Sequence, residues 1–199
     1  MLRAASRARL AILTVACAYT ISILVGIVMV NNGNAFALSY RDKLVGDAVK
    51  KDAVMNANLR NQKPKATMLD FAGNLVIGSI PKAVMGFGIV FPYPFIAYQG
   101  WIGGIVSVRS DHSSRLNNIR SAIYYLLTLI LQIAAYSLTV GAGVNVGISL
   151  FKPAQYYQGE KLIRLFPKEA LVDLARIYAL ATPIFLVGSL WEFLNSWNI

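Results

Sequence analysis

The stretch LAILTVACAYTISILVGIVMVNNGNAFALSY, from Leu10 to Tyr40, contains no charged side chain and decides the class of this protein. Ser121 to Phe151 is a second uncharged run, and Phe71 to Val108 and Ile177 to Ile199 contain one charge each. A helix needs about 20 apolar residues to cross a membrane, where only helices and closed barrels satisfy their backbones. Because the runs do not alternate apolar and polar residues as barrel strands do, they predict a polytopic α-helical membrane protein.

The composition excludes an ordinary soluble domain. Hydrophobic residues make up 56% of the chain and charged residues only 14%, about half the usual share. The 19 Lys and Arg against 9 Asp and Glu give a net charge of +10. These basic residues are scattered over several membrane-flanking loops, so we expect them to contact lipid headgroups and not nucleic acid.

The runs predict an all-α membrane helical bundle with about five spans, formed by residues 1–199 as a single integral membrane domain. One pair of spans is expected to be broken or re-entrant, and amphipathic helices are expected on the membrane surface. In chain order we expect a signal-anchor span (about 10–31), a polar loop (about 39–70), the broken helical pair (about 71–108), a span (about 121–151), and a surface helix with the last span (about 160–197).

The first run has a competing interpretation as a secretory signal peptide, because Ala35-Phe36-Ala37 resembles a cleavage site. The apolar stretch from Leu10 to Val30 is longer than a typical signal core, which favours a retained anchor. Three arginines without an acidic residue precede it and favour a cytoplasmic N-terminus, although the following polar loop is also basic.

Prolines divide the run from Phe71 to Val108. It is too long for one simple span and short for two, and Pro81, Pro92 and Pro94 interrupt it. We expect two close-packed helices with a break at residues 91–94; a re-entrant hairpin is the alternative.

Cysteine and histidine are too scarce for a disulfide or a dedicated metal site. Cys17 lies among small apolar residues and is interpreted as a packing residue, and His112 is the one histidine. The chain also lacks the common nucleotide-binding and hydrolase motifs. We therefore expect no catalytic residue, no metal and no cofactor, and predict that the protein is not an enzyme.

Five polar residues within apolar segments are candidates for intramembrane or partner contacts. Lys82 and Glu192 are the two charges, and an ion pair between them is a hypothesis based on opposite charge in similar surroundings. Asn74, Gln132 and Asn145 are amides, which more often join helices through hydrogen bonds than bind substrate.

Small residues predict where helices approach closely. Gly100 with Gly104, and Gly143 with Gly147, each form a Gly-x-x-x-Gly pattern. Such residues allow backbones to touch inside lipid, where packing replaces the hydrophobic effect. The four glycines are therefore predicted helix-packing positions.

The run that begins at Phe71 also carries a family pattern. Phe71 and Asn74 form a Phe-x-x-Asn start, a glycine-rich helix follows, and Gly100 and Gly104 come after Gln99. This pattern resembles the stage II sporulation protein M family of integral membrane proteins, in which an Asn usually precedes the first of these glycines.

Two later stretches extend the resemblance. In LILQIAAYSLTVGAGVNVGISL, Ala135, Gly143 and Gly147 fit the family's small-residue helix, whereas Gln132 replaces its Glu and the Pro-His-Gly lead-in is missing. Near its end the last run contains Glu192, which resembles the Glu of the family's closing Glu-x-Phe, with either Phe193 or Leu194 at the Phe position. The resemblance implies a multispan membrane architecture and a non-enzymatic role.

We therefore expect a non-catalytic membrane scaffold or accessory subunit of a larger complex in the plasma membrane. Its partners would be membrane lipids and other integral membrane subunits. The alternative is a transporter or channel component with a polar path near Lys82, Gln132 and Asn145.

Overall fold

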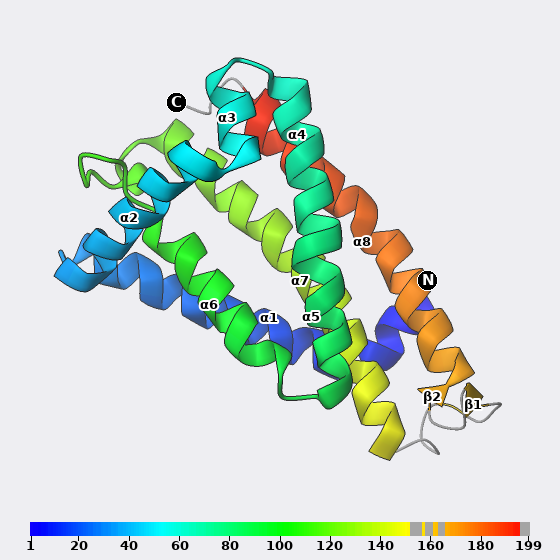
Figure 1. Cartoon of the computed structure of the whole chain (residues 1–199). Helices are drawn as coiled ribbons and strands as arrows, with labels where there is room; N and C mark the ends of the chain where they lie inside the picture. The colour runs from blue at the N-terminus through cyan, green and yellow to red at the C-terminus, as the bar shows by residue number, and fades with distance from the viewer. Residues whose placement is uncertain (152–156, 158–160, 163–165, 196–199) are drawn as a thin grey trace.

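The computed structural model describes residues 1–151, 157, 161–162 and 166–195, and its architecture is helical apart from one very short hairpin (Figure 1). The long and medium helices are α1 (Leu2–Asn31), α2 (Ala35–Lys51), α3 (Ala53–Leu59), α4 (Lys63–Ala72), α5 (Ile80–Met85), α6 (Pro92–Ile105), α7 (Ile119–Phe151) and α8 (Lys168–Leu194). A π-helical segment, η1 (Gly73–Ser79), joins α4 to α5, and the 3-10 turns are η2 (Gly86–Gly88) and η3 (Arg115–Asn117). Strands β1 (Lys161–Leu162) and β2 (Phe166–Pro167) pair antiparallel.

Three helices among the described residues, α1, α7 and α8, are long and apolar enough to cross a membrane. The predicted all-helical fold is confirmed, whereas the predicted count of about five spans is not. The 14 residues of α6 are too few for a complete crossing. The segment from α4 to α5 is divided by the π-helical turn, so none of its helices reaches spanning length alone.

The segment predicted as a polar loop is mostly helical, because short polar side chains start new helices there. After α1 the chain turns at Gly33, which has a φ of +72°, and the side chain of Asn34 accepts a hydrogen bond from Ala37 N at 3.0 Å. Asp52 caps α3 in the same way by accepting from Val54 N at 2.7 Å. The prediction of a polar loop over about 39–70 is therefore corrected to three consecutive helices.

A sharp break separates α5 from α6 near the predicted position. Ile89 has a φ of +61° directly after η2, and Pro92 begins α6, where a proline loses no helical hydrogen bond. Figure 1 shows α6 leaving this break at an angle to α5.

Glycines bring α1 and α6 into backbone contact. A Cβ on Gly100 would lie 2.6 Å from the Tyr19 carbonyl oxygen, and one on Gly104 would overlap the backbone of α1 at Ile23. Tyr19 and Ile23 are buried in the main core at this contact. The predicted Gly-x-x-x-Gly pattern of α6 thus lies against the first helix.

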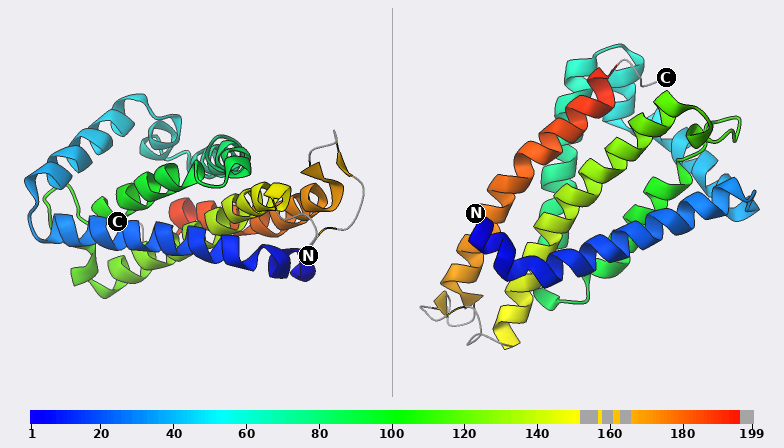
Figure 2. Two further views of the ribbon diagram at one scale, coloured as in Figure 1. Left: turned by 90° about the horizontal axis from the view of Figure 1, so that it is seen from below. Right: turned by 180° about the vertical axis from the view of Figure 1, so that it is seen from behind.

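The second glycine pattern places α7 between two other helices (Figure 2). A Cβ on Gly141 would lie 2.6 Å from Ile12 Cα of α1, whereas one on Gly143 would overlap Ala83 of α5. Gly147 faces η2 in the same manner, 2.6 Å from the carbonyl oxygen of Phe87. Both predicted patterns are therefore used within the chain.

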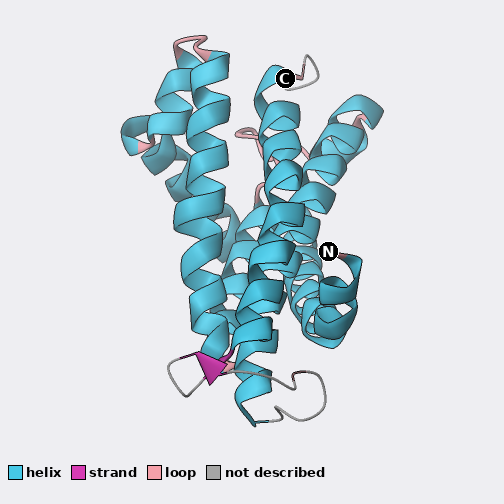
Figure 3. Ribbon diagram, turned by 90° about the vertical axis from the view of Figure 1, so that its right-hand side faces the viewer, coloured by secondary structure: helices cyan, strands magenta, loops and turns pink. Residues whose placement is uncertain are grey.

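Two local predictions are wrong. The described residues of the predicted surface helix from about 160 form the hairpin β1–β2 at the end of α7 (Figure 3); residues 158–160, 163–165 and 196–199 lie outside the described part. Cys17 is exposed and does not pack in the core, because the buried face of α1 carries Val15 and Tyr19 instead.

Candidate functional site

A cavity of about 530 Å³ lies between one end of α7 and the helices around it. Its walls come from α2, α3, α4, α6, α7 and α8, together with the loop that contains η3. Polar and charged side chains are unusually dense on these walls for a membrane helix bundle. They include Arg41, Asp70, Gln99, Arg115, Gln132 and Glu192.

The acidic wall is formed where α4 meets the end of α8. Ser189 donates a hydrogen bond from Oγ to Asp70 Oδ2 at 2.6 Å. Glu192 follows Ser189 by one helical turn and therefore lies on the same face of α8. Asp70 and Glu192 also interact electrostatically. The two carboxyl groups are thus held on one side of the cavity by different helices.

Aromatic side chains fix the end of α8 against α7. Tyr124 donates from its hydroxyl to the Glu192 carbonyl oxygen at 2.8 Å, and Trp191 Nε1 donates to the Tyr124 carbonyl oxygen at 3.1 Å. Their rings stack with centroids 6.1 Å apart. This reciprocal contact sets the position of Glu192 relative to α7.

The basic wall is formed by α2 and the η3 loop. Arg41 is only 5% exposed, and Arg115 is anchored by its backbone N, which donates to the Ser107 carbonyl oxygen at 2.8 Å. The Nε atom of each arginine is buried without a hydrogen-bond partner. Since buried donors are normally paired, the two Nε atoms depart from ordinary packing.

Contacts of the Asp42 carboxylate at the surface join the two elements of the basic wall, α2 and the η3 loop. His112 Nε2 lies 2.9 Å from Asp42 Oδ2, and Arg41 Nη1 donates to Asp42 Oδ1 at 2.9 Å. The hydrogen bond from His112, followed by that from Arg41, holds the pKa of the Asp42 carboxyl below its usual value. The Asp42–His112 contact therefore connects α2 to the loop that carries Arg115.

A second cavity of about 440 Å³ adjoins the first. Gln99 and Ile102 line both, so the amide of Gln99 lies at their junction. Lys82 lines the second cavity; its Nζ donates to the Gly78 carbonyl oxygen at 2.8 Å and lies 5.2 Å from the centre of the Tyr136 ring. The two cavities together place basic, acidic and amide groups along one side of α6.

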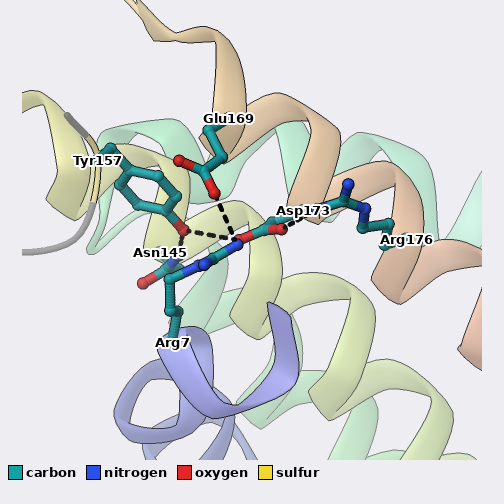
Figure 4. Close-up of polar contacts among 6 residues, drawn as sticks. All are labelled: Arg7, Asn145, Tyr157, Glu169, Asp173 and Arg176. Carbon is teal, nitrogen blue, oxygen red and sulfur yellow. Dashed lines mark hydrogen bonds and ion pairs between the residues drawn. The ribbon is translucent and has the colours of Figure 1, made fainter. Parts of the chain in front are cut away.

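A separate polar cluster lies at the other end of the bundle (Figure 4). Asp173 of α8 is 1% exposed and accepts from Arg7 Nε at 2.6 Å and from Arg176 Nη1 at 3.1 Å. Asn145 Nδ2 donates to the Tyr157 hydroxyl at 2.8 Å, which in turn donates to Asp173 at 3.4 Å. This cluster joins α1, α7 and α8 and lines neither of the two cavities described above.

The five polar residues predicted from the sequence are thus distributed over four places. Gln132 and Glu192 line the large cavity, and Asn74 lines a small recess beside it while accepting from the Tyr136 hydroxyl at 2.7 Å. Lys82 lies in the second cavity, and Asn145 belongs to the distant cluster. Asn145 thus lies apart from the two cavities that Gln132 and Lys82 line.

The hypothesis of a Lys82–Glu192 ion pair is also wrong. In the described part of the chain no ion pair joins these residues; Lys82 is satisfied by a carbonyl oxygen and an aromatic ring, whereas Glu192 lies near Asp70. Similar surroundings in the sequence do not fix which helix faces meet.

Sequence reasoning missed Arg41, Asp70 and Arg115 as cavity residues, because each lies in a polar segment beside an apolar run. The position of Asp70 directly before Phe71 is the one signal that could have indicated it. Across the residues the structure describes, no group of three or more His, Cys, Asp or Glu side chains could hold a metal ion. No protein-family model, curated protein or solved structure matches this chain.

Proposed function

We propose that this protein binds a small polar solute inside its membrane helix bundle and serves as a transporter or channel component. The cavity between α2, α4, α7 and α8 carries this proposal. Charged groups in membrane helices are costly, and they commonly mark solute or ion pathways. Glycines and apolar side chains alone would meet the needs of helix packing, so Asp70, Glu192 and Arg115 require another explanation.

The junction at Gln99 supports a path and not a closed pocket. Gln99 and Ile102 line both the large cavity and the one at Lys82, so only these side chains stand between the two. Polar groups spaced along such a route can replace water around a moving solute. We place the solute path along α6 for this reason, since residues of α6 line both cavities.

We further propose that α4–η1–α5 and α6 enter the membrane as a broken helical pair, which crosses through the longer α4–η1–α5 part because α6 alone is too short. Val90 at the break between them is 68% exposed. If the pair crosses, Val90→Cys and Asn61→Cys will react with an impermeant thiol reagent from opposite sides of sealed vesicles. Reaction of both from one side would contradict the crossing.

Thiol labelling tests whether the large cavity holds water. In a Cys17→Ser background, we expect Gln132→Cys on the cavity wall to react with a negatively charged, membrane-impermeant methanethiosulfonate. Ile130→Cys is the matched control, since Ile130 lies on the same helix at nearly the same depth but is 59% exposed on the outer apolar surface. Because these reagents need a hydrated thiolate, Gln132→Cys should react at least about tenfold faster.

The two rates decide the proposal once both variants are shown to label fully after denaturation. A fast Gln132→Cys and a slow Ile130→Cys support an aqueous solute site. Equal and slow reaction would mean that the cavity is dry, and would overturn a transport or channel role.

A scaffold or accessory role in a larger plasma-membrane complex stays a prediction. Both glycine patterns contact helices of this chain, so they do not supply a surface for another subunit. Gentle detergent extraction followed by mass spectrometry tests the role directly. Stoichiometric membrane partners would support it, and a lone monomer or homo-oligomer would contradict it.

A further inference from the structure

Two arginines from distant segments meet at the basic wall of the large cavity. Arg41 lies on α2 and Arg115 on the η3 loop, and both line the cavity. They are close enough for the charge of Arg41 to act on Arg115. Like charges that lie close together in a partly buried site repel each other. An anionic group between the two guanidinium groups would remove this repulsion.

The chain leaves hydrogen-bond donors of both arginines unused. Arg41 is only 5% exposed, and Asp42 binds it through Nη1 at 2.9 Å. Among the described residues, the buried Nε atoms of Arg41 and Arg115 have no hydrogen-bond partner. Glu192 interacts electrostatically with Arg115 and offsets part of its charge, but it does not accept a hydrogen bond from this Nε atom. Because buried donors are normally paired, we expect an acceptor that is not part of the chain.

Fixed contacts hold the two arginines at their present spacing. The Asp42 carboxylate accepts from Arg41 and lies 2.9 Å from His112 Nε2. His112 belongs to the same loop as Arg115, whose backbone N donates to the Ser107 carbonyl oxygen at 2.8 Å. A site that is held in place before its ligand arrives loses less conformational entropy on binding. The two guanidinium groups are thus positioned in advance.

Two other carboxylates of the cavity are used elsewhere. Asp70 of α4 accepts a hydrogen bond from Ser189 at 2.6 Å. Asp52 accepts from the backbone amides that begin α3, and it follows Arg41 by a stretch of helix about 16 Å long. These two acidic groups therefore do not take the place of an anion at the arginines.

A pair of guanidinium groups favours phosphate over a carboxylate. One guanidinium fork already matches both oxygens of a carboxylate, whereas a phosphate monoester has three terminal oxygens that can accept from two forks at once. Building on the binding function proposed above, we propose that Arg41 and Arg115 bind a phosphate monoester in the large cavity. The cavity volume of about 530 Å³ leaves space for the rest of the ligand. This phosphate belongs either to a soluble solute or to a lipid headgroup.

Thermal unfolding in a maltoside detergent tests the site, because this detergent carries no phosphate. Inorganic phosphate is compared with sodium chloride of equal ionic strength, and phosphatidic acid, a monoester, with phosphatidylglycerol, a diester. At about one hundred times its Kd, the bound probe should raise Tm by roughly 5–10 °C above its control. If neither inorganic phosphate at about 10 mM nor phosphatidic acid raises Tm above its control, the inference is wrong.

The same two comparisons identify the source of the phosphate. An effect of inorganic phosphate supports a soluble phosphate ester as the ligand. An effect of phosphatidic acid alone supports a lipid headgroup.

Arginine variants show whether the effect arises at this site. Arg41→Gln and Arg115→Gln should each weaken binding of the active probe at least about tenfold, because each removes charge-assisted hydrogen bonds. Arg109→Gln is the matched control. Arg109 belongs to the same loop and donates to Ser121 Oγ at 3.4 Å, but it is not a lining residue of the cavity. Its loss should weaken binding less than about fivefold, and equal losses in all three variants would contradict the site.

Lysine variants keep the test decisive if a glutamine variant fails to fold. Arg41→Lys and Arg115→Lys keep the charge and remove the guanidinium fork. Both should bind the active probe more weakly than wild type, whereas Arg109→Lys should not. Unchanged binding by both cavity variants would contradict recognition by the two forks.

The outcomes separate this inference from the proposed function. Fast labelling of Gln132→Cys without any phosphate effect would overturn the phosphate site and leave an aqueous solute site. Slow labelling with a phosphate effect would overturn the transport role and leave the phosphate site. Slow labelling without a phosphate effect would overturn both.

Discussion

At the scale of single residues, Asp173 shows how a buried charge is neutralised in this bundle. It is enclosed by Arg7, Arg176 and Tyr157, so its carboxylate has partners from three segments (Figure 4). Glu169 also pairs with Arg7, at 3.1 Å, but its side chain is 46% exposed. The same arginine therefore makes one buried contact and one solvent-accessible contact.

We expect Asp173→Asn to destabilise the protein by about 3–5 kcal/mol, because it breaks a buried ion pair and leaves Arg7 without its main partner. Glu169→Gln is the matched control and should cost less than about 1 kcal/mol, as exposed pairs do. Chemical unfolding in detergent measures both. Equal losses would show that burial does not govern this cluster.

The residue types predicted which helix positions pack closely better than they predicted which charged side chains form ion pairs. Gly104 and Gly143 lie at backbone contacts because only a missing side chain permits them, and that requirement is visible in the spacing. Lys82 and Glu192 had no comparable signal. A charge can be satisfied by a carbonyl oxygen or a ring, as Lys82 is, so opposite charge alone does not identify a partner.

At the scale of elements, the contact between α1 and α6 depends on one of two adjacent glycines. A Cβ on Gly104 would overlap the α1 backbone at Ile23, which cannot move aside alone. A Cβ on Gly103 would meet the flexible end of the Leu129 side chain at 3.3 Å. The two positions have the same helical environment and differ in what they face.

Gly104→Ala should therefore destabilise the bundle by about 1–3 kcal/mol or more through overpacking. Gly103→Ala should change the unfolding free energy by less than about 1 kcal/mol, since alanine's better helix propensity offsets a small side-chain shift. Thermal unfolding of both variants gives the comparison. A larger loss at Gly103 would contradict the α1–α6 contact.

The contact between α2 and the η3 loop should weaken in acid. The pKa of Asp42 is lowered in the folded protein, so this carboxylate stabilises the fold above its ordinary pKa of about 3.9 and the contribution is lost as pH falls through the lower folded value. The difference in Tm between wild type and Asp42→Asn should therefore be larger at about pH 5 than at about pH 3. A constant difference would show that the carboxylate charge does not matter.

Helix positions within the polar segment were only partly predictable. Asn34 and Asp52 are standard N-cap residues, and both start helices in the structure. Their segment was nevertheless predicted to be a loop, because it contains few apolar residues. Its helices are stabilised largely by tertiary contacts, which the sequence does not show. Trp101 of α6, for example, packs on Tyr40 of α2 with ring centroids 5.2 Å apart.

At the scale of the whole molecule, α1 is a structural helix of the bundle. Its residues Val15, Tyr19 and Ile23 belong to the main core, and Arg7 reaches α8. Cleavage after Ala37, as for a secretory signal peptide, would remove these contacts. We therefore expect the membrane-extracted protein to retain residues 1–37, and intact-mass measurement to find them. A mass that begins at Leu38 would contradict this.

The helical class and the long apolar helices followed from charge-free runs, because lipid permits few alternatives for such segments. The cavity did not follow. Its charges belong to segments that are far apart in the chain, and Arg41 and Asp70 gain their common environment only when α2 packs on α6 and α4 packs on α8. Neither residue had a local pattern that distinguishes it from an ordinary surface charge.

The two ends of α7 differ in mechanical stiffness. At one end, Gly141 and Gly143 pack directly against the backbones of α1 and α5. A small shift of α7 there would cause steric overlap with one of these two helices. The cavity end is held by side-chain hydrogen bonds, such as the one of 2.8 Å from the Tyr124 hydroxyl to α8, which can break while the backbone packing at the glycines stays in place. If the cavity opens, the helices around it should therefore pivot near Gly141 and Gly143. The largest displacements should then occur at the cavity residues Asp70 and Arg115.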